Sequence, residues 1–400
     1  MVQVTSSAGS EQETWNHAPL PAVPLATTIP TSEAGRQVAE ILSLADIRIN
    51  GGRPWDIQVH DERFYQRVIS QGSIGAGESY MDGWWDCEKL DELVCRLFNA
   101  GIDRQIRTWG MALAAITARL TNRQSRTRSF RVGTQHYDIG NDLYERMLDS
   151  RMIYSCACWT EAGNLEAAQE RKLDLICRKL RLAPGLRLLD IGCGWGGLAR
   201  FAAERYAVQV VGVTVSQEQV TGARQRCSGL PVEIRFQDYR SLDEPFDRIV
   251  SVGMFEHVGY KNYRAFMSVV DRCLKEEGFF LLQTIGGNTS VTTSDPWLER
   301  YIFPNGMLPS AAQITSAIEG LFILEDWHNF GPDYDTTLLA WWRRFEDAWP
   351  ELSGRYGERF RRMWHYYLLS CAGAFRARVN QLWQIVLTKD RPGGCYRPAK

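Results

Sequence analysis

A buried strand that runs into a glycine-rich turn is the feature that most constrains how this 400-residue chain can fold. Residues Leu188–Gly197 have the sequence LLDIGCGWGG, in which Gly192, Gly194 and Gly197 follow the spacing G-x-G-x-x-G. Glycines at this spacing permit a tight turn and allow the backbone to approach a ligand at the N-terminus of the following helix. The turn therefore predicts a ligand-binding strand–turn–helix unit.

Strand and helix patterns alternate on both sides of this turn, from about residue 133 onward. The expected strands are Arg187–Ile191, Val208–Val213, Val232–Gln237, Phe246–Val252, Gly278–Thr284 and Phe322–Trp327. This alternation predicts the α/β class, with a doubly wound, mostly parallel Rossmann-like sheet. Ligands of such sheets lie at the carboxyl ends of the strands, so we expect functional residues just after Ile191, Val213, Gln237, Val252 and Leu282. The stretch 338–387 is expected to be helical.

Composition shifts divide the chain into four parts. Residues 1–30 are expected to form a disordered tail, 31–118 a smaller N-terminal α+β domain, 119–132 a linker and 133–400 the α/β domain. Inside the N-terminal domain, the glycine-rich and aromatic stretch Gly72–Trp85 is expected to be a structured loop.

The formal net charge of −1 gives no general attraction to nucleic acid. Locally, seven arginines between residues 104 and 131 face one acidic residue, Asp103. They predict either a solvated helix and connector or a patch that meets anionic lipid headgroups. The sequence has no long apolar run and no signal-like N-terminus, so we expect a cytoplasmic chain. The ten cysteines lack the spacing of a zinc knuckle, so we expect reduced thiols and no metal site.

Two observations separate the alternatives for the glycine turn. NAD-binding sheets carry an acid at the end of the second strand, whereas residues 212–216 here are GVTVS. A carboxylate at Asp190, two residues before the first glycine, is unfavourable for a pyrophosphate but suits a cationic ligand. The order D-x-G-x-G-x-G resembles S-adenosylmethionine-dependent methyltransferases, with Thr214 and Gln219 as candidates for ribose contacts and Asp238–Tyr239 as a border of the adenine.

Three further stretches combine reactive or small residues with an apolar and aromatic context. They are Tyr154–Trp159 (YSCACW), Gly253–Gly259 (GMFEHVG) and Gly331–Tyr334 (GPDY). Glu256 is either a catalytic carboxylate beside the cleft or an acid in a solvent-facing loop, and the position favours the first. His257 is expected to be structural, because adjacent residues at a strand end point in different directions.

Together these stretches make the chain resemble the bacterial cyclopropane-fatty-acid-phospholipid synthases. The likeness spans about residues 35–390 and includes the Gly72–Trp85 stretch of the N-terminal domain. The motifs that carry it are HYDIGNDLY (136–144), YSCACW (154–159), LLDIGCGWGG (188–197), VVGVTVSQEQ (210–219), FDRIVSVGMFEHVG (246–259), IFPNGMLPS (302–310) and EDWHNFGPDYDTT (325–337).

The resemblance implies a reaction and a set of site residues. The cis double bond of a phospholipid acyl chain attacks the methyl group of S-adenosylmethionine, and a proton leaves the resulting carbocation to bicarbonate as the ring closes. Implied residues around bicarbonate are Cys156, Glu256, Tyr334, the amide of Ile285, and Gln283 at the position where the family has histidine. Implied cofactor-binding residues are Tyr137, Tyr154, Ser155, Asp190, Gly192, Cys193, Gly194, Gly196, Thr214, Gln219, Asp238 and Tyr239.

The same resemblance implies unsaturated phospholipids as partners, a homodimer, and peripheral association with the inner face of the cell membrane. Arg355, Arg359, Arg361 and Arg362 are further candidates for contacts with headgroups.

Gln283 is either a conservative hydrogen-bonding replacement or a change that weakens anion binding. Two other functions stay open. In these alternatives, the chain is either a related enzyme that forms a methyl-branched lipid or methylates a small molecule, or a membrane-associated scaffold that binds the cofactor without turnover.

Overall fold

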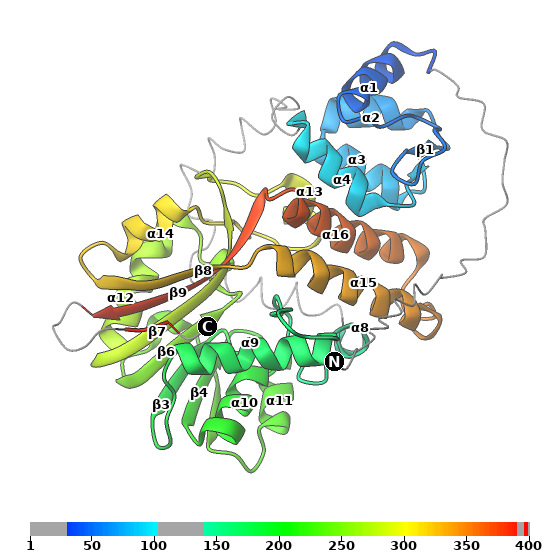
Figure 1. Cartoon of the computed structure of the whole chain (residues 1–400). Coiled ribbons are helices and arrows are strands. Elements are labelled where there is room, and N and C mark those ends of the chain that lie inside the picture. The colour runs from blue at the N-terminus through cyan, green and yellow to red at the C-terminus, as the bar shows by residue number, and fades with distance from the viewer. Residues whose placement is uncertain (1–29, 103–139, 390–395, 399–400) are drawn as a thin grey trace, which may run out of the picture.

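The computed structural model describes residues 30–102, 140–389 and 396–398 (Figure 1). Several expectations fall outside these ranges: almost all of the tail, the linker 119–132, the seven arginines between 104 and 131, and Tyr137. Among the described residues, no helix is long and apolar enough to cross a membrane.

A seven-stranded sheet forms the centre of the larger domain, in the order β5-β4-β3-β6-β7-β9-β8. Neighbouring strands from β5 to β7 are parallel, whereas β9 is antiparallel to both β7 and β8. The strands are β3 (Arg187–Ile191), β4 (Gln209–Thr214), β5 (Val232–Phe236), β6 (Phe246–Val252), β7 (Leu274–Gly287), β8 (Phe322–Asn329) and β9 (Asn380–Lys389). The predicted Rossmann-like α/β fold is confirmed.

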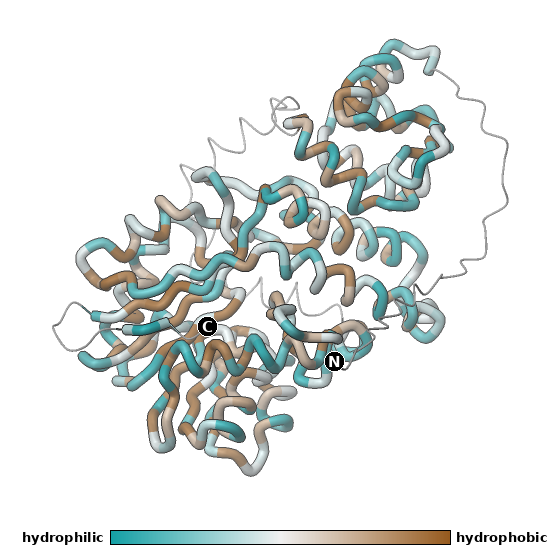
Figure 2. Tube along the Cα trace, viewed as in Figure 1, coloured by the Kyte–Doolittle hydropathy of each residue, from teal (hydrophilic) through white to brown (hydrophobic). Residues whose placement is uncertain are grey.

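Helices cover both faces of this sheet, which explains why its strands are almost continuously apolar (Figure 2). Leu188 packs on one face with helices α9 (Leu165–Lys179) and α10 (Gly197–Tyr206). Its neighbour Leu189 packs on the other face with α12 (Tyr263–Cys273) and α14 (Ala311–Ile318). Helix α11 (Gln217–Arg226) packs beside β5 through Val220 and Ala223.

The expectation of an all-helical stretch at 338–387 is wrong in its last part. Helices α15 (Pro332–Leu352) and α16 (Glu358–Arg376) are present, but the chain then enters strand β9. The apolar run LWQIVL in β9 is buried between β7 and β8, and a short run of this kind does not distinguish a strand from a buried helix. The apolar stripe of α16, which includes Trp364 and Leu368, is packed in the core as expected.

The N-terminal domain is mostly helical around one two-stranded ribbon. Its elements are α1 (Glu33–Ser43), β1 (Gln58–Val59), α2 (Arg63–Gln71), α3 (Ser73–Met81), β2 (Trp85–Asp86) and α4 (Leu90–Asn99), and α8 (Asn141–Met147) is the first described helix after it. The expectation of a loop at Gly72–Trp85 is wrong, because residues 73–81 form α3. Glycine disfavours helices, but here tertiary packing prevails: a Cβ atom on Gly77 would lie 2.4 Å from the ring of Trp297, on α13 (Pro296–Tyr301).

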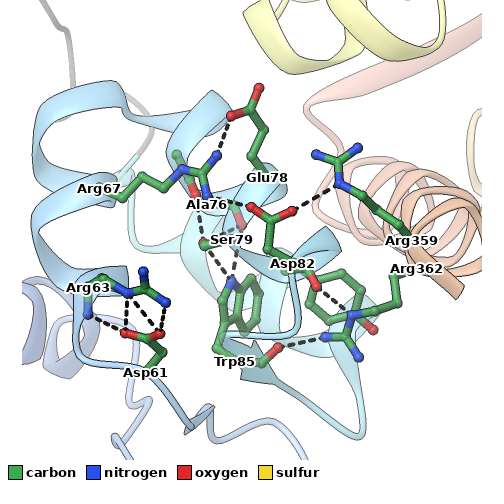
Figure 3. Close-up of polar contacts among 12 residues, drawn as sticks. Asp61, Arg63, Arg67, Ala76, Glu78, Ser79, Asp82, Trp85, Arg359 and Arg362 are labelled. Atoms are coloured by element: carbon green, nitrogen blue, oxygen red, sulfur yellow. Dashed lines mark hydrogen bonds and ion pairs between the residues drawn. The ribbon is translucent and has the colours of Figure 1, made fainter.

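Ion pairs join the N-terminal domain to α16 (Figure 3). Arg359 donates to Asp82 at 2.9 Å, and Arg362 donates to Asp86 at 2.6 Å and to the carbonyl of Trp85. Arg355 and Arg361, the other two arginines expected to meet headgroups, pair with Asp142 and Glu346. All four side chains therefore have carboxylate partners, and two of them hold the domains together instead of forming an uncompensated basic patch.

Replacing Gly77 with valine is expected to lower the thermal unfolding temperature by several degrees. The added side chain would collide with the Trp297 ring, and overpacking of this kind costs about 1–3 kcal/mol. The matched control is Gly52→Ala in the same domain, because no atom lies within 4 Å of the added methyl group. Equal melting temperatures for the two variants, measured by differential scanning calorimetry, would contradict the packing argument.

Candidate active site

A cavity lies at the carboxyl ends of β3, β4, β5 and β6, where the glycine turn follows β3. Strand β3 has β4 on one side and β6 on the other, so the cavity sits where the direction of the strand order reverses. Ten of the predicted cofactor-binding residues line it: Tyr154, Ser155, Asp190, Gly192, Cys193, Gly194, Thr214, Gln219, Asp238 and Tyr239. Gly196 is not part of the lining, and Tyr137 lies outside the described residues.

The glycine turn has the backbone conformation that its sequence predicted. Gly192, Gly194 and Gly196 have φ angles of 86°, 54° and 82°, a region that other residues rarely adopt. A Cβ atom on Gly192 would lie 2.7 Å from the side chain of Met254, whereas one on Gly194 would meet no atom within 4 Å. The backbone at Gly194 is thus open to close approach by a ligand at the start of α10.

Asp190 supplies a buried negative group to this cavity. Its side chain is 2% exposed, and burial raises its pKa to about 7. Within the described part of the chain, its Oδ2 atom has no hydrogen-bond partner. A buried carboxylate oxygen without a donor is costly, and a cationic ligand would both satisfy it and lower its pKa. The cavity therefore fits a ligand that carries an ammonium group.

The opposite side of the cavity is formed by the residues after β4 and β5. Thr214 and Gln219 are both buried, and the Thr214 hydroxyl donates to Gln219 Oε1 at 2.7 Å. Asp238 pairs with Arg240 at 2.9 Å and caps the short helix η1 (Tyr239–Ser241). These polar groups all line the cavity, and their contacts with ribose and adenine stay a prediction.

Glu256 lies on the short helix η2 (Phe255–His257) that follows β6. Its Oε1 atom accepts a hydrogen bond of 2.7 Å from the amide of Ile285, while Oε2 is buried with no partner among the described residues. Burial raises the pKa of Glu256 to about 7, against the lowering effect of the Ile285 amide. The carboxyl group is therefore poised between its protonated and ionised forms near neutral pH.

Cys156 and Tyr334 lie in the same buried region as Glu256. Burial raises the pKa of the Tyr334 phenol well above its usual value, and the nearby Cys156 thiol and Glu256 carboxylate raise it further. The Cys156 thiol is completely buried and donates to the Ala157 carbonyl at 3.2 Å. Burial also raises the thiol pKa, which disfavours the thiolate form that a nucleophilic cysteine needs.

Gln283 lies within β7 and not after its end, because β7 continues to Gly287 in register with β9. Its side chain is 1% exposed, and its Oε1 atom accepts a hydrogen bond of 2.9 Å from Gln384. Its Nε2 atom is buried without a partner among the described residues. Gln283 and Ile285 are two residues apart on one strand, so their side chains share a face of the sheet.

His257 lines the cofactor cavity, whereas the adjacent Glu256 carboxylate bonds to Ile285. The two side chains thus lie in different regions, although they are on η2 and not on a strand end, and the structural role expected for His257 stays a prediction. Burial lowers the pKa of His257 to about 4, so its ring is neutral at neutral pH.

Sequence reasoning missed Lys172, which is 1% exposed and lines the cavity from α9. Its Nζ atom donates to the hydroxyl of Ser155 at 2.9 Å. A signal was present in the sequence: Lys172 lies four residues after Ala168 and four before Ile176, both in the buried stripe of the helix.

Replacing Glu256 with glutamine is expected to change how stability depends on pH. Because the folded pKa lies above the unfolded value of about 4.5, Glu256 binds a proton more tightly in the folded protein, and stability falls as pH rises toward 7. Glutamine removes this loss, which amounts to about 3 kcal/mol for such a shift. We expect the unfolding temperature of Glu256→Gln, relative to the unmodified protein, to rise between pH 5 and pH 8. A constant difference over that range would place the carboxyl group in a solvated environment.

Comparisons with known proteins agree with this geometry. The profile of the family described as "Mycolic acid cyclopropane synthetase" matches residues 124–385. The chain is 55% identical over 368 residues to "Cyclopropane-fatty-acyl-phospholipid synthase" of Escherichia coli (strain K12), a match that covers 92% of this chain and 96% of that protein. It is 34% identical to "Tuberculostearic acid methyltransferase UfaA1" of Mycobacterium tuberculosis, over 82% and 81% of the two chains.

Solved structures show the same fold. The cyclopropane synthase MmaA2 from Mycobacterium tuberculosis superposes with a TM-score of 0.61 at 32% identity, covering 65% of this chain and 98% of its own. The mycolic acid cyclopropane synthase CmaA1, solved in complex with SAH and CTAB, gives the same TM-score, identity and coverage. From the family match over residues 124–385 and the 55% identity over nearly the whole chain, the protein belongs to the mycolic acid cyclopropane synthetase family.

Proposed function

We propose that this protein transfers a methylene group from S-adenosylmethionine to the cis double bond of unsaturated acyl chains in phospholipids. The observation that carries the proposal is that two neighbouring residues, Ser155 and Cys156, belong to two different parts of the candidate site. Ser155 lines the cavity of the glycine turn, and Cys156 belongs to the buried group with Glu256 and Tyr334. Adjacent residues thus connect a site for a cationic cofactor with a buried, largely apolar cluster that contains proton donors.

The prediction of an S-adenosylmethionine-dependent methyltransferase is confirmed by family membership and by the relative from Escherichia coli. When bound, the cofactor supplies an electrophilic methyl group. In this chain, Asp190 would hold the ammonium group, and the backbone of Gly192–Gly194 would approach the ligand closely. Thr214, Gln219 and Asp238 would contact the nucleoside, while Tyr239 borders it.

The residues around Glu256 support bicarbonate as the base of the reaction. With a pKa of about 7, Glu256 can hold a proton on Oε2 and donate it to a neighbouring anion, which avoids repulsion between two negative groups. Gln283 Nε2 is a second buried donor, and the Tyr334 phenol keeps its proton because its pKa is raised. The Ile285 amide is bonded to Glu256 and so orients the carboxyl group.

The part of the proposal that concerns the acyl chain is supported by the apolar and aromatic side chains packed around Tyr334. Tyr334 is edge-on to Trp341 and stacks at a tilt on Phe375, with ring centroids 5.9 Å and 4.6 Å away. Aromatic faces accept an alkyl chain and stabilise a passing positive charge without competing for it as nucleophiles. Peripheral binding at the inner face of the cell membrane and a homodimer are part of the same proposal.

Incubating the protein with S-adenosylmethionine and vesicles of an unsaturated phospholipid is expected to yield fatty acids that are heavier by one CH₂ per double bond. Glu256→Gln is expected to reduce this product by about 100-fold or more, because bicarbonate, the proposed base, loses the carboxyl group that holds it. Binding of S-adenosylhomocysteine is expected to survive. Mass spectrometry of the fatty acids and calorimetry of cofactor binding are the measurements. Unchanged turnover in Glu256→Gln would remove Glu256 from the site.

Fragmentation of the same product tests the second candidate function, a methyl-branched lipid. This candidate is favoured by the 34% identity to the relative named as a tuberculostearic acid methyltransferase. A saturated ring and a methyl branch have different fragmentation patterns, so a branched product would replace cyclopropanation as the activity. Binding of the cofactor without any lipid product would instead favour the alternative of a membrane scaffold that has no enzymatic activity.

Gln283→His is expected to preserve or raise turnover. Histidine can donate a hydrogen bond to the anion as the glutamine amide does, and it can also carry a proton. Turnover is measured as a function of bicarbonate concentration for both proteins. A large loss at saturating bicarbonate would show that Gln283 supports a chemistry that histidine cannot replace.

A further inference from the structure

Lys172 is a buried lysine whose role the proposed reaction leaves unassigned. It lies on α9, its side chain is 1% exposed, and its Nζ atom donates to Ser155 Oγ at 2.9 Å. Burial lowers its pKa to about 8, while the nearby Asp149, Cys156 and Asp190 favour the charged form. A buried ammonium group is costly, so its place in the cavity wall calls for a compensating anion.

The charges in the cavity wall fall into two sets. Asp238 and Arg240 neutralise one another through an ion pair of 2.9 Å. Lys172 and Asp190 also line the cavity, and each shifts the pKa of the other, yet no ion pair joins them in the described structure. The wall thus presents one positive and one negative group to the same space, as the binding of an amino-acid zwitterion requires.

We propose that Lys172 is a positioning residue for the carboxylate of the amino-acid end of the cofactor, and that it acts through Ser155. An ammonium group has donors only, so its bond to Ser155 uses the serine oxygen as the acceptor. The hydroxyl hydrogen of Ser155 is then left to donate to an anion in the cavity. Asp190 Oδ2, which is buried without a donor, takes the ammonium group of the same ligand. This inference rests on the proposed use of S-adenosylmethionine.

A purely structural role for Lys172 would involve Asp149 instead. Asp149 is 2% exposed and accepts hydrogen bonds from the amides of Arg151 and Ile153, which shapes the loop before Ser155. The charge of Lys172 lowers the pKa of this carboxyl group against the effect of burial. If stabilising Asp149 were the whole role, loss of Lys172 would weaken every ligand of the cavity to the same extent.

Three ligands measured by isothermal titration calorimetry separate these roles. S-adenosylhomocysteine carries the ammonium and the carboxylate, its decarboxylated analogue keeps only the ammonium, and methylthioadenosine lacks both. We expect Lys172→Met to weaken S-adenosylhomocysteine by about 10- to 100-fold, the range typical of a lost hydrogen bond to a charged group. Binding of the other two ligands is expected to change by less than about threefold.

Lys179→Met is the matched control. Lys179 is also buried on α9, but it pairs with Asp326 at 2.8 Å and does not line the cavity, so all three affinities should stay unchanged. Ser155→Ala, a smaller change, is expected to reproduce the selective loss. The double variant of Lys172 and Ser155 is expected to bind little more weakly than Lys172→Met, because one residue acts through the other.

Two outcomes would overturn the inference: an equal loss for the three ligands, or unchanged S-adenosylhomocysteine binding in Lys172→Met. If Lys172→Met does not fold, the Ser155→Ala series decides by the same criteria. If the unmodified protein does not bind S-adenosylhomocysteine, the proposed cofactor and this inference both fail. If the selective pattern appears but vesicles yield no modified lipid, only the proposed lipid reaction fails.

Discussion

The antiparallel pairing of β7 with β9 is the constraint on which the geometry around Glu256 depends. The register runs from Phe279 opposite Thr388 to Gly287 opposite Asn380, so β7 continues well past the point where β6 ends. Gln283 is the last residue of β7 that pairs with β6, and the extension beyond it holds Ile285 in the sheet through β9. The Ile285 amide in turn fixes the Glu256 carboxyl group, and Gln384 on β9 fixes the side-chain amide of Gln283.

The same pairing determines where the last two long helices lie. Strands β8 and β9 are antiparallel neighbours, so the end of β8 lies beside the start of β9. The connection between them, which contains α15 and α16, therefore leaves and re-enters the sheet at the same end of these strands. Tyr334 lies in the first turn of α15, close enough to Glu256 and Cys156 for their charges to raise its pKa. Arg376, in the last turn of α16, bridges Asp335 to Asp91 of the N-terminal domain. The N-terminal domain is therefore tied to the residue that follows Tyr334.

Buried charge is used in two ways in this molecule. Lys179 and Asp326 form an ion pair of 2.8 Å away from the cavity, between α9 and β8. Asp190 and Glu256 each keep one oxygen without a partner among the described residues, and burial raises the pKa of both to about 7. Unsatisfied buried groups destabilise a fold, so their presence is best explained by ligands that complete them.

The sequence by itself determined the α/β class, the position of the glycine turn and ten residues that line the cavity beside it, because these depend on local patterns. Strand-ending residues of a parallel sheet meet at one edge, so Asp190, Thr214 and Asp238 could be placed together without coordinates. The sequence also singled out the stretches that contain Glu256, Cys156 and Tyr334, but only the resemblance grouped these residues around one anion, since they lie far apart along the chain.

Only the tertiary structure decided the identity of β9, the helix at Ser73–Met81 and the position of Lys172 in the cavity wall. The apolar run of β9 has no period that separates strand from helix, and its partners β7 and β8 precede it by many residues. Glycines that disfavour a helix are accepted in α3 because the Trp297 ring occupies the space beside Gly77. A lysine in an apolar stripe marks a buried charge, but its bond to Ser155 depends on how α9 packs against the loop between α8 and α9. Each of these outcomes follows from contacts between segments distant in sequence, which local residue preferences do not contain.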